Sequence, residues 1–199
     1  WLGSTPLAYY TEKRVHPQNG YGRPGWLRCE QFGAGMITGW GSHHVDIGHW
    51  GMDTEFTGPI SIGGKAEFPT SGLWNVHGAY HIEAKYANGV TMIIDNTFKN
   101  GIRFEGSDGW IFVTRGRIEA SRPELLSEPL PPGAVRLPVS DHHHRNFFDC
   151  IRSRQKPICD VEIGHRAATV CHLGVIALRT GLRLQWDPVR ERFTNHREA

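Results

Sequence analysis

The sequence predicts an α+β fold in which an open, mainly antiparallel β-sheet is flanked by helices. Between residues 60 and 120, short segments rich in β-branched and aromatic residues alternate with turn residues, which is typical of an antiparallel sheet. Between residues 141 and 180, apolar residues recur at helical spacing in two longer segments. The chain has 199 residues, enough to bury a sizeable core, so we expect residues 1–199 to form a single domain.

The N-terminal part is predicted to contain a long ordered loop followed by one short helix. Residues 1–35 are rich in glycine, proline and aromatic residues without a sustained period, and loops of this length are usually functional. The segment 42–51 has helical character because His43, Ile47 and Trp50 recur at i, i+4 and i+7. Ser42 is placed to cap the N-terminus of this helix.

The middle of the chain is predicted to form a meander of strands. The clearest hairpin turns at Ala87-Asn88-Gly89, because Asn-Gly supplies the positive φ that a tight reversal needs. Ile82, Ala84 and Tyr86 would then share one face of the sheet. The predicted strands are Ile60–Phe68, His77–Tyr86, Val90–Phe98, Gly101–Glu105, Trp110–Thr114 and Arg117–Ala120.

The C-terminal part is predicted to hold a connector, two helices and a tail. Residues 121–140 contain five prolines, so we expect no regular structure there. A helix over 141–154 would be capped by Ser140 or Asp141, and a second over 163–180 would end before Gly181. The tail covers residues 182–199. The first helix would carry Phe147, Phe148 and Ile151 on its apolar side, and the second would bury Ala167, Val170, Cys171, Val175 and Leu178.

Composition and charge exclude several classes of protein. The formal net charge is +2 and the 22 lysines and arginines are scattered, so no basic stripe suits a nucleic-acid backbone. No apolar run approaches the roughly 20 residues that a membrane-spanning helix needs. The spacing of the four cysteines fits neither a Cys-x-x-Cys pair nor a zinc knuckle, so we expect free thiols in a reducing, cytoplasmic setting.

The segment 36–50 is the most informative for function, because it concentrates three histidines and two tryptophans. Such a cluster is a metal site, a catalytic edge or a tightly packed polar helix start. On a helix, His43 and His44 point roughly 100° apart and the pattern is not His-Glu-x-x-His, which disfavours a metal, although His142-His143-His144 could approach from elsewhere.

A catalytic role is favoured for His43, which follows the glycine-rich segment closely and has Asp46 nearby. For His44 and His49, packing against Trp40 and Trp50 explains the residues at least as well. The three interpretations therefore remain open for the cluster as a whole.

Motifs along nearly the whole chain carry a resemblance to a known family. They are Trp1-Leu2-Gly3, Gly39-Trp40-Gly41-Ser42-His43-His44-Val45-Asp46-Ile47 with Trp50-Gly51, Asn100-Gly101-Ile102-Arg103-Phe104-Glu105-Gly106 with Gly109-Trp110, His144-Arg145-Asn146-Phe147, Ile163-Gly164-His165-Arg166, and Trp186-Asp187-Pro188 with Phe193. Together they resemble the Gfo/Idh/MocA oxidoreductases, particularly the bacterial sugar-dehydrogenase-like branch. The resemblance implies a C-terminal substrate-binding and dimerisation domain, which in that family sits beside an N-terminal Rossmann domain that binds NAD or NADP.

The Rossmann domain itself is absent from this sequence. No Gly-x-Gly-x-x-Gly motif follows a strand, and Gly63-Gly64 lies inside a strand pattern. We therefore expect neither NAD nor NADP to bind this chain alone, and we expect the chain to be inactive without a Rossmann domain.

The resemblance also implies the site residues. The family joins a lysine of the Rossmann domain to an aspartate and a histidine spaced Asp-x-x-x-His. The histidine falls on His43, whereas the aspartate position falls on Gly39, and Asp46 supports the site without filling that position. Aromatic faces and a few oriented donors suit a sugar. The further substrate-binding candidates are Trp40, His44, Arg28, His142 and His165.

The favoured function is therefore the substrate-binding and dimerisation domain of an NAD(P)-dependent oxidoreductase that acts on a sugar or polyol hydroxyl. The expected partners are a sugar or polyol, the missing Rossmann domain and a second copy bound through the sheet face. Two alternatives remain. One is a stand-alone carbohydrate-binding or assembly domain, and the other is a metal-dependent hydrolase or lyase that uses the histidine cluster.

Overall fold

The computed structural model describes residues 2–20 and 22–196 and divides the chain into two compact units. The first unit comprises Trp1–Lys99 and Arg166–Ala199, and the second comprises Asn100–His165. The first contains a five-stranded sheet with helices, and the second contains a three-stranded sheet followed by short helices. The predicted class, open antiparallel sheets with flanking helices, is confirmed.

The sheet of the first unit has the strand order β3-β2-β1-β7-β8 with antiparallel pairing throughout. The predicted hairpin is confirmed, because β2 and β3 pair across a turn in which Gly89 has a φ of 87°. Ile82, Ala84 and Tyr86 are buried, as their predicted common face requires. The strands are β1 (Ser61–Ala66), β2 (Tyr80–Lys85), β3 (Thr91–Asp95), β7 (Leu184–Asp187) and β8 (Arg192–Phe193).

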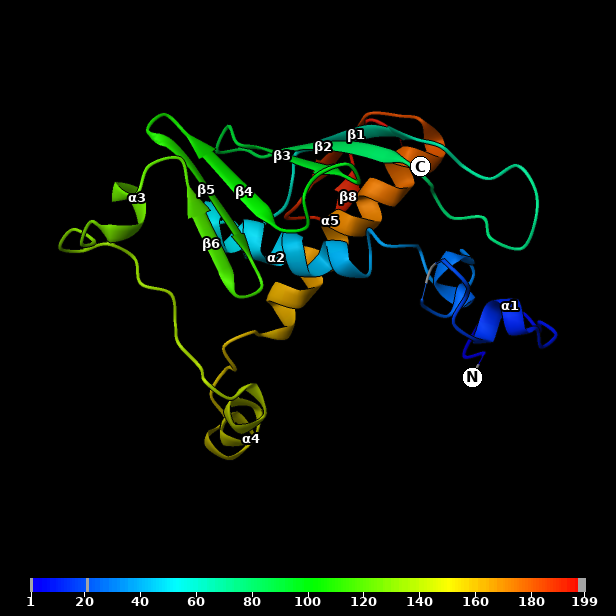
Figure 1. Cartoon of the computed structure of the whole chain (residues 1–199), viewed down its shortest axis with the longest axis horizontal. Helices are drawn as coiled ribbons and strands as arrows, with labels where there is room; N and C mark the ends of the chain where they lie inside the picture. Colours follow the sequence, from blue (N-terminus) through cyan, green and yellow to red (C-terminus); the bar gives the residue numbers. More distant parts are fainter. Residues whose placement is uncertain (1, 21, 197–199) are drawn as a thin grey trace. The chain divides into compact units, whose positions relative to one another are not determined.

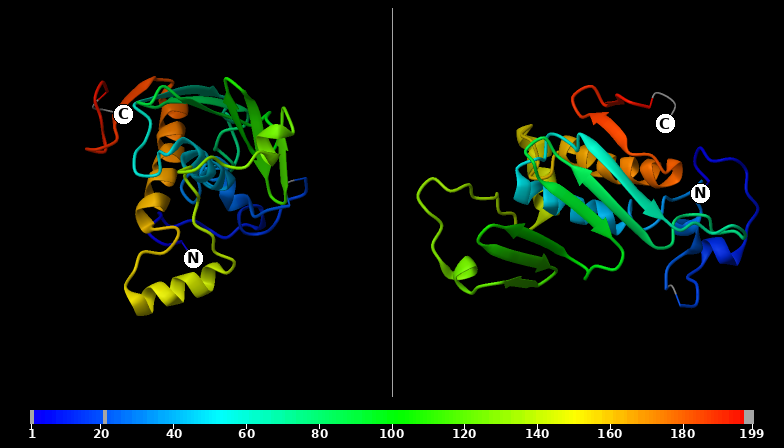
Figure 2. Two further views of the ribbon diagram at one scale, coloured as in Figure 1. Left: turned by 90° about the vertical axis from the view of Figure 1, so that its left-hand side faces the viewer. Right: turned by 90° about the horizontal axis from the view of Figure 1, so that it is seen from above.

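Two helices, α2 (Trp40–Met52) and α5 (Val161–Thr180), lie along the same face of this sheet (Figure 1, Figure 2). On the apolar side predicted for α5, Val175 is only partly buried, whereas the other residues are buried in the core: Ala167, Val170, Cys171 and Leu178. Each fully buried aliphatic side chain there contributes about 1.5–3 kcal/mol. A Cβ at Gly174 would lie 2.9 Å from Cδ1 of Ile82, so glycine lets α5 approach β2 closely. Gly181 has a φ of 67° and ends the helix as predicted.

Residues 2–20 and 22–35 of the N-terminal segment are mostly loop but contain a helical turn, α1 (Glu12–Val15), and a 3-10 turn, η1 (Gly25–Arg28). A bidentate ion pair ties this segment to α5. Nε and Nη2 of Arg179 donate to the two carboxylate oxygens of Glu30 at 2.8 and 2.9 Å. A paired guanidinium of this kind fixes orientation as well as position, so the loop is held in one arrangement.

The second unit corrects the prediction of one continuous meander. Its strands form a separate sheet of order β4-β5-β6, with β4 (Ile102–Gly106), β5 (Gly109–Thr114) and β6 (Arg117–Ala120). The break has a local cause. At the end of β3, Oδ1 of Asp95 accepts hydrogen bonds from both the backbone N–H and the hydroxyl of Thr97, and this local turn ends the strand.

Some element boundaries also differ from the predictions. The helix predicted over 42–51 begins at Trp40 with Gly39 as N-cap, and the hydroxyl of Ser42 donates back to the Gly39 carbonyl at 2.7 Å, so Ser42 is not the cap. The cap of α4 (His143–Ser153) is His142, whose ring accepts from the N–H of Arg145 at 3.2 Å, and not Ser140 or Asp141.

The segments predicted as a connector and a tail are partly regular. The proline-rich connector contains one helical turn, α3 (Glu124–Ser127), and the tail that begins at residue 182 supplies β7 and β8 to the first sheet. The apolar side predicted for α4 exists, but Phe147, Phe148 and Ile151 are exposed. None of the helices in the described residues is long and apolar enough to cross a membrane.

Candidate functional site

The N-terminal half of α2 carries a group of polar and aromatic side chains that we call the α2 cluster: Arg23, Trp40, His43, His44 and Asp46. Four of them come from α2 itself, and Arg23 comes from the preceding loop. The helix turns the apolar side with Val45 and Gly48 into the core. The opposite side is therefore left for groups that can meet a ligand.

The rings of Trp40, His43 and His44 lie together at the first turn of α2. The centroids of Trp40 and His43 are 5.6 Å apart, and those of Trp40 and His44 are 6.1 Å apart. His43 is exposed, whereas Trp40 and His44 are half-buried. The arrangement places one accessible imidazole beside an indole face.

The hydrogen bond of His44 fixes its tautomer. Its Nδ1 lies 2.8 Å from the carbonyl oxygen of Trp40, one turn earlier in the helix. Because a carbonyl oxygen only accepts, Nδ1 carries the proton, and Nε2 of the neutral ring is an acceptor. His44 can therefore accept a hydrogen bond from a ligand hydroxyl through Nε2.

Asp46 lies one turn after His43, and its carboxyl group is partly buried in a way that disfavours the negatively charged form. Burial raises the pKa of its carboxyl group, and the positive charge of His43 acts in the opposite direction. Oδ1 is buried and has no hydrogen-bond partner among residues 2–20 and 22–196. Asp46 therefore places a desolvated carboxyl group one helical turn from the exposed imidazole of His43.

His49 belongs to the opposite, buried side of α2. It is fully buried, and its Nε2 lies 2.8 Å from the hydroxyl of Tyr86. Burial lowers the pKa of His49 to about 4, so the ring is neutral at physiological pH. The packing interpretation fits His49, although its partner is Tyr86.

The position where the resemblance implies an aspartate is sterically open. Gly39 is the N-cap of α2 with a φ of −83°, a value that every residue type adopts. A Cβ built there would meet no heavy atom closer than the carbonyl oxygen of Gly35 at 3.6 Å. Packing therefore does not require glycine at this position.

The other predicted binding residues lie on different elements. Arg28 is at the end of η1, and its guanidinium carbon lies 5.3 Å from the ring centroid of Trp74. In the second unit, His142 caps α4, and His165 is an exposed residue of α5. The first unit thus brings together Trp40, His43, His44 and Asp46, and it places Arg28 on another side-chain stack.

Arg23 is the member of the α2 cluster that the sequence analysis did not single out. Its guanidinium carbon lies 5.7 Å from the ring centroid of Trp40. The only local signal was the pair of turn glycines, Gly20 and Gly22, just before it.

A metal is not favoured by this geometry, since no three histidine, cysteine or carboxylate side chains in the described part of the chain are placed to hold one.

A family comparison decides the identity of the fold. The model of the oxidoreductase family C-terminal alpha/beta domain, the C-terminal domain of Gfo/Idh/MocA proteins, matches residues 1–199. The chain belongs to the Gfo/Idh/MocA oxidoreductase family. The resemblance inferred from the sequence motifs is therefore correct, and the α2 cluster lies in the C-terminal domain of this family.

Solved structures support the same fold for this Gfo/Idh/MocA domain. An NAD-binding protein from Listeria innocua matches with a TM-score of 0.58 and 18% identity, over 82% of this chain and 51% of that one. The WlbA dehydrogenase from Bordetella pertussis, in complex with NADH and UDP-GlcNAcA, matches with a TM-score of 0.58 and 16% identity. The match covers 87% of this chain and 52% of that one. Aldose-aldose oxidoreductase from Caulobacter crescentus matches with a TM-score of 0.53 and 14% identity, over 80% of this chain and 50% of that one. The chain thus spans about half the length of the structures it matches, and no curated protein matches its sequence.

The solved structures that match this chain include proteins with bound NADH and NAD+, but the elements described for this chain do not suit a dinucleotide. A dinucleotide binds at the turn between a strand and a helix of a parallel βαβ unit. Among the strands described, every pairing is antiparallel, and α2 and α5 each follow a non-strand segment. The described residues therefore contain no strand–helix turn of the kind that holds a dinucleotide.

Proposed function

We propose that this chain is the substrate-binding half of an NAD(P)-dependent oxidoreductase that acts on a hydroxyl group of a sugar or polyol. In this proposal NAD or NADP is held by residues outside the chain, and His43 is the acid/base. The observation that carries the proposal is the exposed imidazole of His43 next to the indole of Trp40, on a helix of a family-defined oxidoreductase domain.

The chemistry of the α2 cluster suits this role. Oxidation of an alcohol requires a base that takes the hydroxyl proton, and imidazole is a side chain suited to this task near neutral pH. The indole of Trp40 offers an apolar face for the C–H groups of a sugar ring. Nε2 of His44 offers an acceptor for a second hydroxyl, because Nδ1 is bound to the helix carbonyl.

The direct test is the substitution His43→Asn in the full-length protein, with turnover followed by the absorbance of the reduced nicotinamide. We expect kcat/KM to fall by a factor of about 100 or more, which is the usual contribution of a general base. His172→Asn is the matched control, because His172 is an exposed histidine on α5. Equal turnover of the His43→Asn variant and the wild type would refute the catalytic assignment.

The location of the cofactor site has its own test. Calorimetric titration of NAD and of NADP into the 199-residue chain should give no measurable heat of binding, whereas the full-length protein should bind one of them. Tight binding by the chain alone would contradict the proposal. Binding of a sugar by the full-length protein without any nicotinamide-linked turnover would instead favour a carbohydrate-binding or assembly domain.

We further propose that two copies associate through the face of the five-stranded sheet that α2 and α5 leave uncovered. That face is mainly polar and carries the Arg183–Glu83 ion pair at 3.0 Å, with exposed Ile93 on β3. The substitution Ile93→Lys should shift the mass measured by light scattering from dimer to monomer. Val189→Lys, at another exposed residue, is the control. A wild-type monomer would refute this assignment.

A further inference from the structure

Arg23 is an exposed cation at the edge of the proposed substrate site. Its guanidinium carbon lies 5.7 Å from the ring centroid of Trp40, whose indole is itself beside His43. A guanidinium over an aromatic face keeps its charge and presents its N–H donors around its rim. The cation, the indole and the candidate base are therefore neighbours in one site.

The loop around Arg23 holds its backbone in place. Pro17 and Pro24 form an isolated antiparallel bridge, and the N–H of Gln18 donates to the carbonyl of Arg23 at 3.2 Å. The N–H of Gly22 donates to the carbonyl of Gln18 at 2.9 Å. These contacts fix the backbone position from which the Arg23 side chain projects.

Arg23 differs from the other arginines that lie over aromatic rings. The guanidinium of Arg103 pairs with Glu105 at 2.8 Å, and that of Arg179 pairs with Glu30 at 2.8 Å. The guanidinium of Arg23 has neither an ion pair nor a hydrogen bond with any residue that the structure describes. Its donors are therefore available to a ligand.

We infer that the substrate is an acidic sugar, that is, a sugar bearing a carboxylate or phosphate group, and that Arg23 binds this anionic group while His43 serves the reacting hydroxyl. The inference rests on the proposed function of the α2 cluster. A guanidinium matches both groups because two parallel N–H donors meet two oxygens of a carboxylate or phosphate. The indole of Trp40 then spans the sugar ring between the anion and the hydroxyl.

The test compares neutral and acidic sugars with the full-length protein. The probes are the neutral sugar D-glucose and its acidic forms D-glucuronate and D-glucose 6-phosphate. A second set consists of the corresponding neutral and acidic sugars of the galactose series. Binding is measured by calorimetry, and nicotinamide-linked turnover is measured in parallel. The variants are Arg23→Gln and the control Arg192→Gln, which removes an exposed arginine from β8.

We expect the wild type to favour an acidic sugar over its neutral counterpart, and Arg23→Gln to reduce this preference by roughly tenfold or more, as the loss of one charge-assisted contact implies. Arg192→Gln should keep the preference. Preference for uronates or for sugar phosphates tells which anion the site takes. Equal binding of neutral and acidic sugars, no binding of any acid, or an unchanged preference in Arg23→Gln would overturn the inference.

The same experiment separates this inference from the proposed function. If acidic sugars bind through Arg23 but no nicotinamide-linked turnover depends on His43, the acidic-sugar site stands and the oxidoreductase proposal fails. If turnover depends on His43 but is indifferent to Arg23, the oxidoreductase proposal stands and the acidic-sugar inference fails.

Discussion

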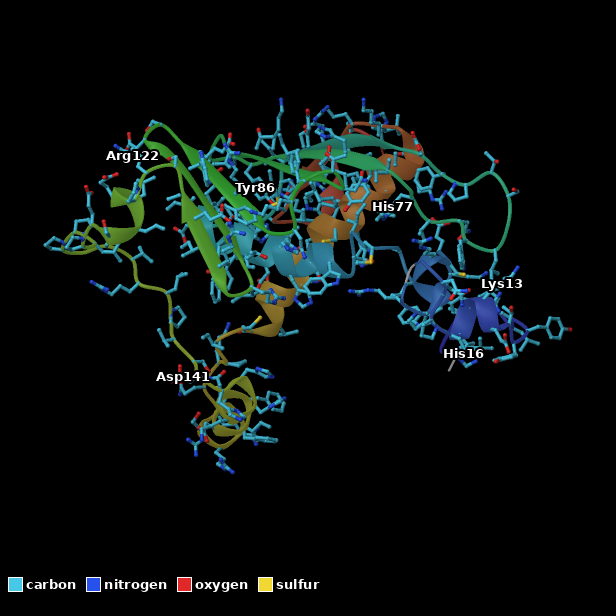
Figure 3. The ribbon with its side chains drawn as sticks, in the orientation of Figure 1. Lys13, His16, His77, Tyr86, Arg122 and Asp141 are labelled. Carbon is cyan, nitrogen blue, oxygen red and sulfur yellow. The ribbon has the colours of Figure 1, made fainter. Side chains whose placement is uncertain are left out.

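The hydroxyl of Tyr86 lies 2.8 Å from Nε2 of His49, and this contact joins the buried side of α2 to the end of β2. Both side chains are buried, and their rings meet edge to face with centroids 5.7 Å apart (Tyr86 is labelled in Figure 3). Asp46 and His43 precede His49 by about one and two turns of the same helix. The contact therefore fixes the rotation of α2 and, with it, the outward position of His43.

Removal of the Tyr86 hydroxyl should destabilise the fold. Tyr86→Phe leaves Nε2 of His49 buried without a partner, which costs about 1–3 kcal/mol in the free energy of unfolding. Urea denaturation measures this loss. Tyr80→Phe is the control, because the Tyr80 hydroxyl has no side-chain hydrogen bond with the residues described and should cost less than about 0.5 kcal/mol. Equal losses in the two variants would contradict the role of the contact.

The buried histidine also predicts how stability depends on pH. Burial lowers the pKa of His49 from 6.5 to about 4, so the unfolded chain takes up a proton at a higher pH than the folded chain. The stabilisation is fully present above about pH 6.5 and is lost as the pH falls toward 4. Burial lowers the pKa of His77 as well, which acts in the same direction (Figure 3).

We expect the free energy of unfolding to fall by an amount on the order of 3 kcal/mol from His49 between these two pH values. Urea denaturation at several pH values measures the slope. The variant His49→Gln should show a shallower slope than the wild type, because its side chain does not titrate. A slope that is the same in both proteins would show that His49 does not carry the effect.

Local sequence signals predicted the elements that depend on neighbouring residues. The Asn88-Gly89 hairpin and the apolar side of α5 follow from turn chemistry and helical period, and the structure confirms both. The insertion of β7 beside β1 could not be predicted in this way, because it pairs Ser61 with Gln185 across the length of the chain. No local period encodes a pairing between residues so far apart.

The candidate site likewise contains residues that local sequence signals predict and residues that only the folded structure brings together. His43 was predicted from its place after a glycine-rich turn, and the structure leaves it exposed at the start of α2. Arg23 was not predicted, because only the folded loop brings it over Trp40. Ser42 was wrongly predicted as the cap, since its hydroxyl can bond backward along the helix to Gly39 as well as forward.

Two glycines should respond in opposite ways to alanine. A Cβ at Gly64 in β1 would lie 2.3 Å from the carbonyl oxygen of His81, so Gly64→Ala forces the strands apart and should cost about 1–3 kcal/mol or more. At Gly164 in α5 the Cβ would meet nothing within 4 Å, so Gly164→Ala should stabilise by about 0.5–1 kcal/mol. Thermal and urea unfolding of both variants test the pair. A tolerated Gly64→Ala would contradict the close β1–β2 approach.

Asp46 should show a conflict between stability and function. Its pKa is raised by burial, so keeping the carboxylate ionised at neutral pH costs stability. Asp46→Asn should therefore raise the free energy of unfolding at pH 7, and the gain should vanish at a pH where the wild-type carboxyl is protonated. The same variant should lower kcat/KM, though by less than His43→Asn. A variant that is less stable and fully active would contradict both roles of the carboxylate.

Gly39 offers a test of the active-site assignment that adds a group instead of removing one. The position has a φ of −83° and room for a Cβ, and an N-cap aspartate differs from glycine by only a few tenths of a kcal/mol, so Gly39→Asp should fold normally. The new carboxylate would lie one turn before His43 and favour its protonated form in the transition state. We expect kcat/KM of the full-length protein to rise by about tenfold, or about 1.4 kcal/mol. The gain should disappear in the double variant with His43→Asn, and a gain that persists there would show that His43 is not the group on which the aspartate acts.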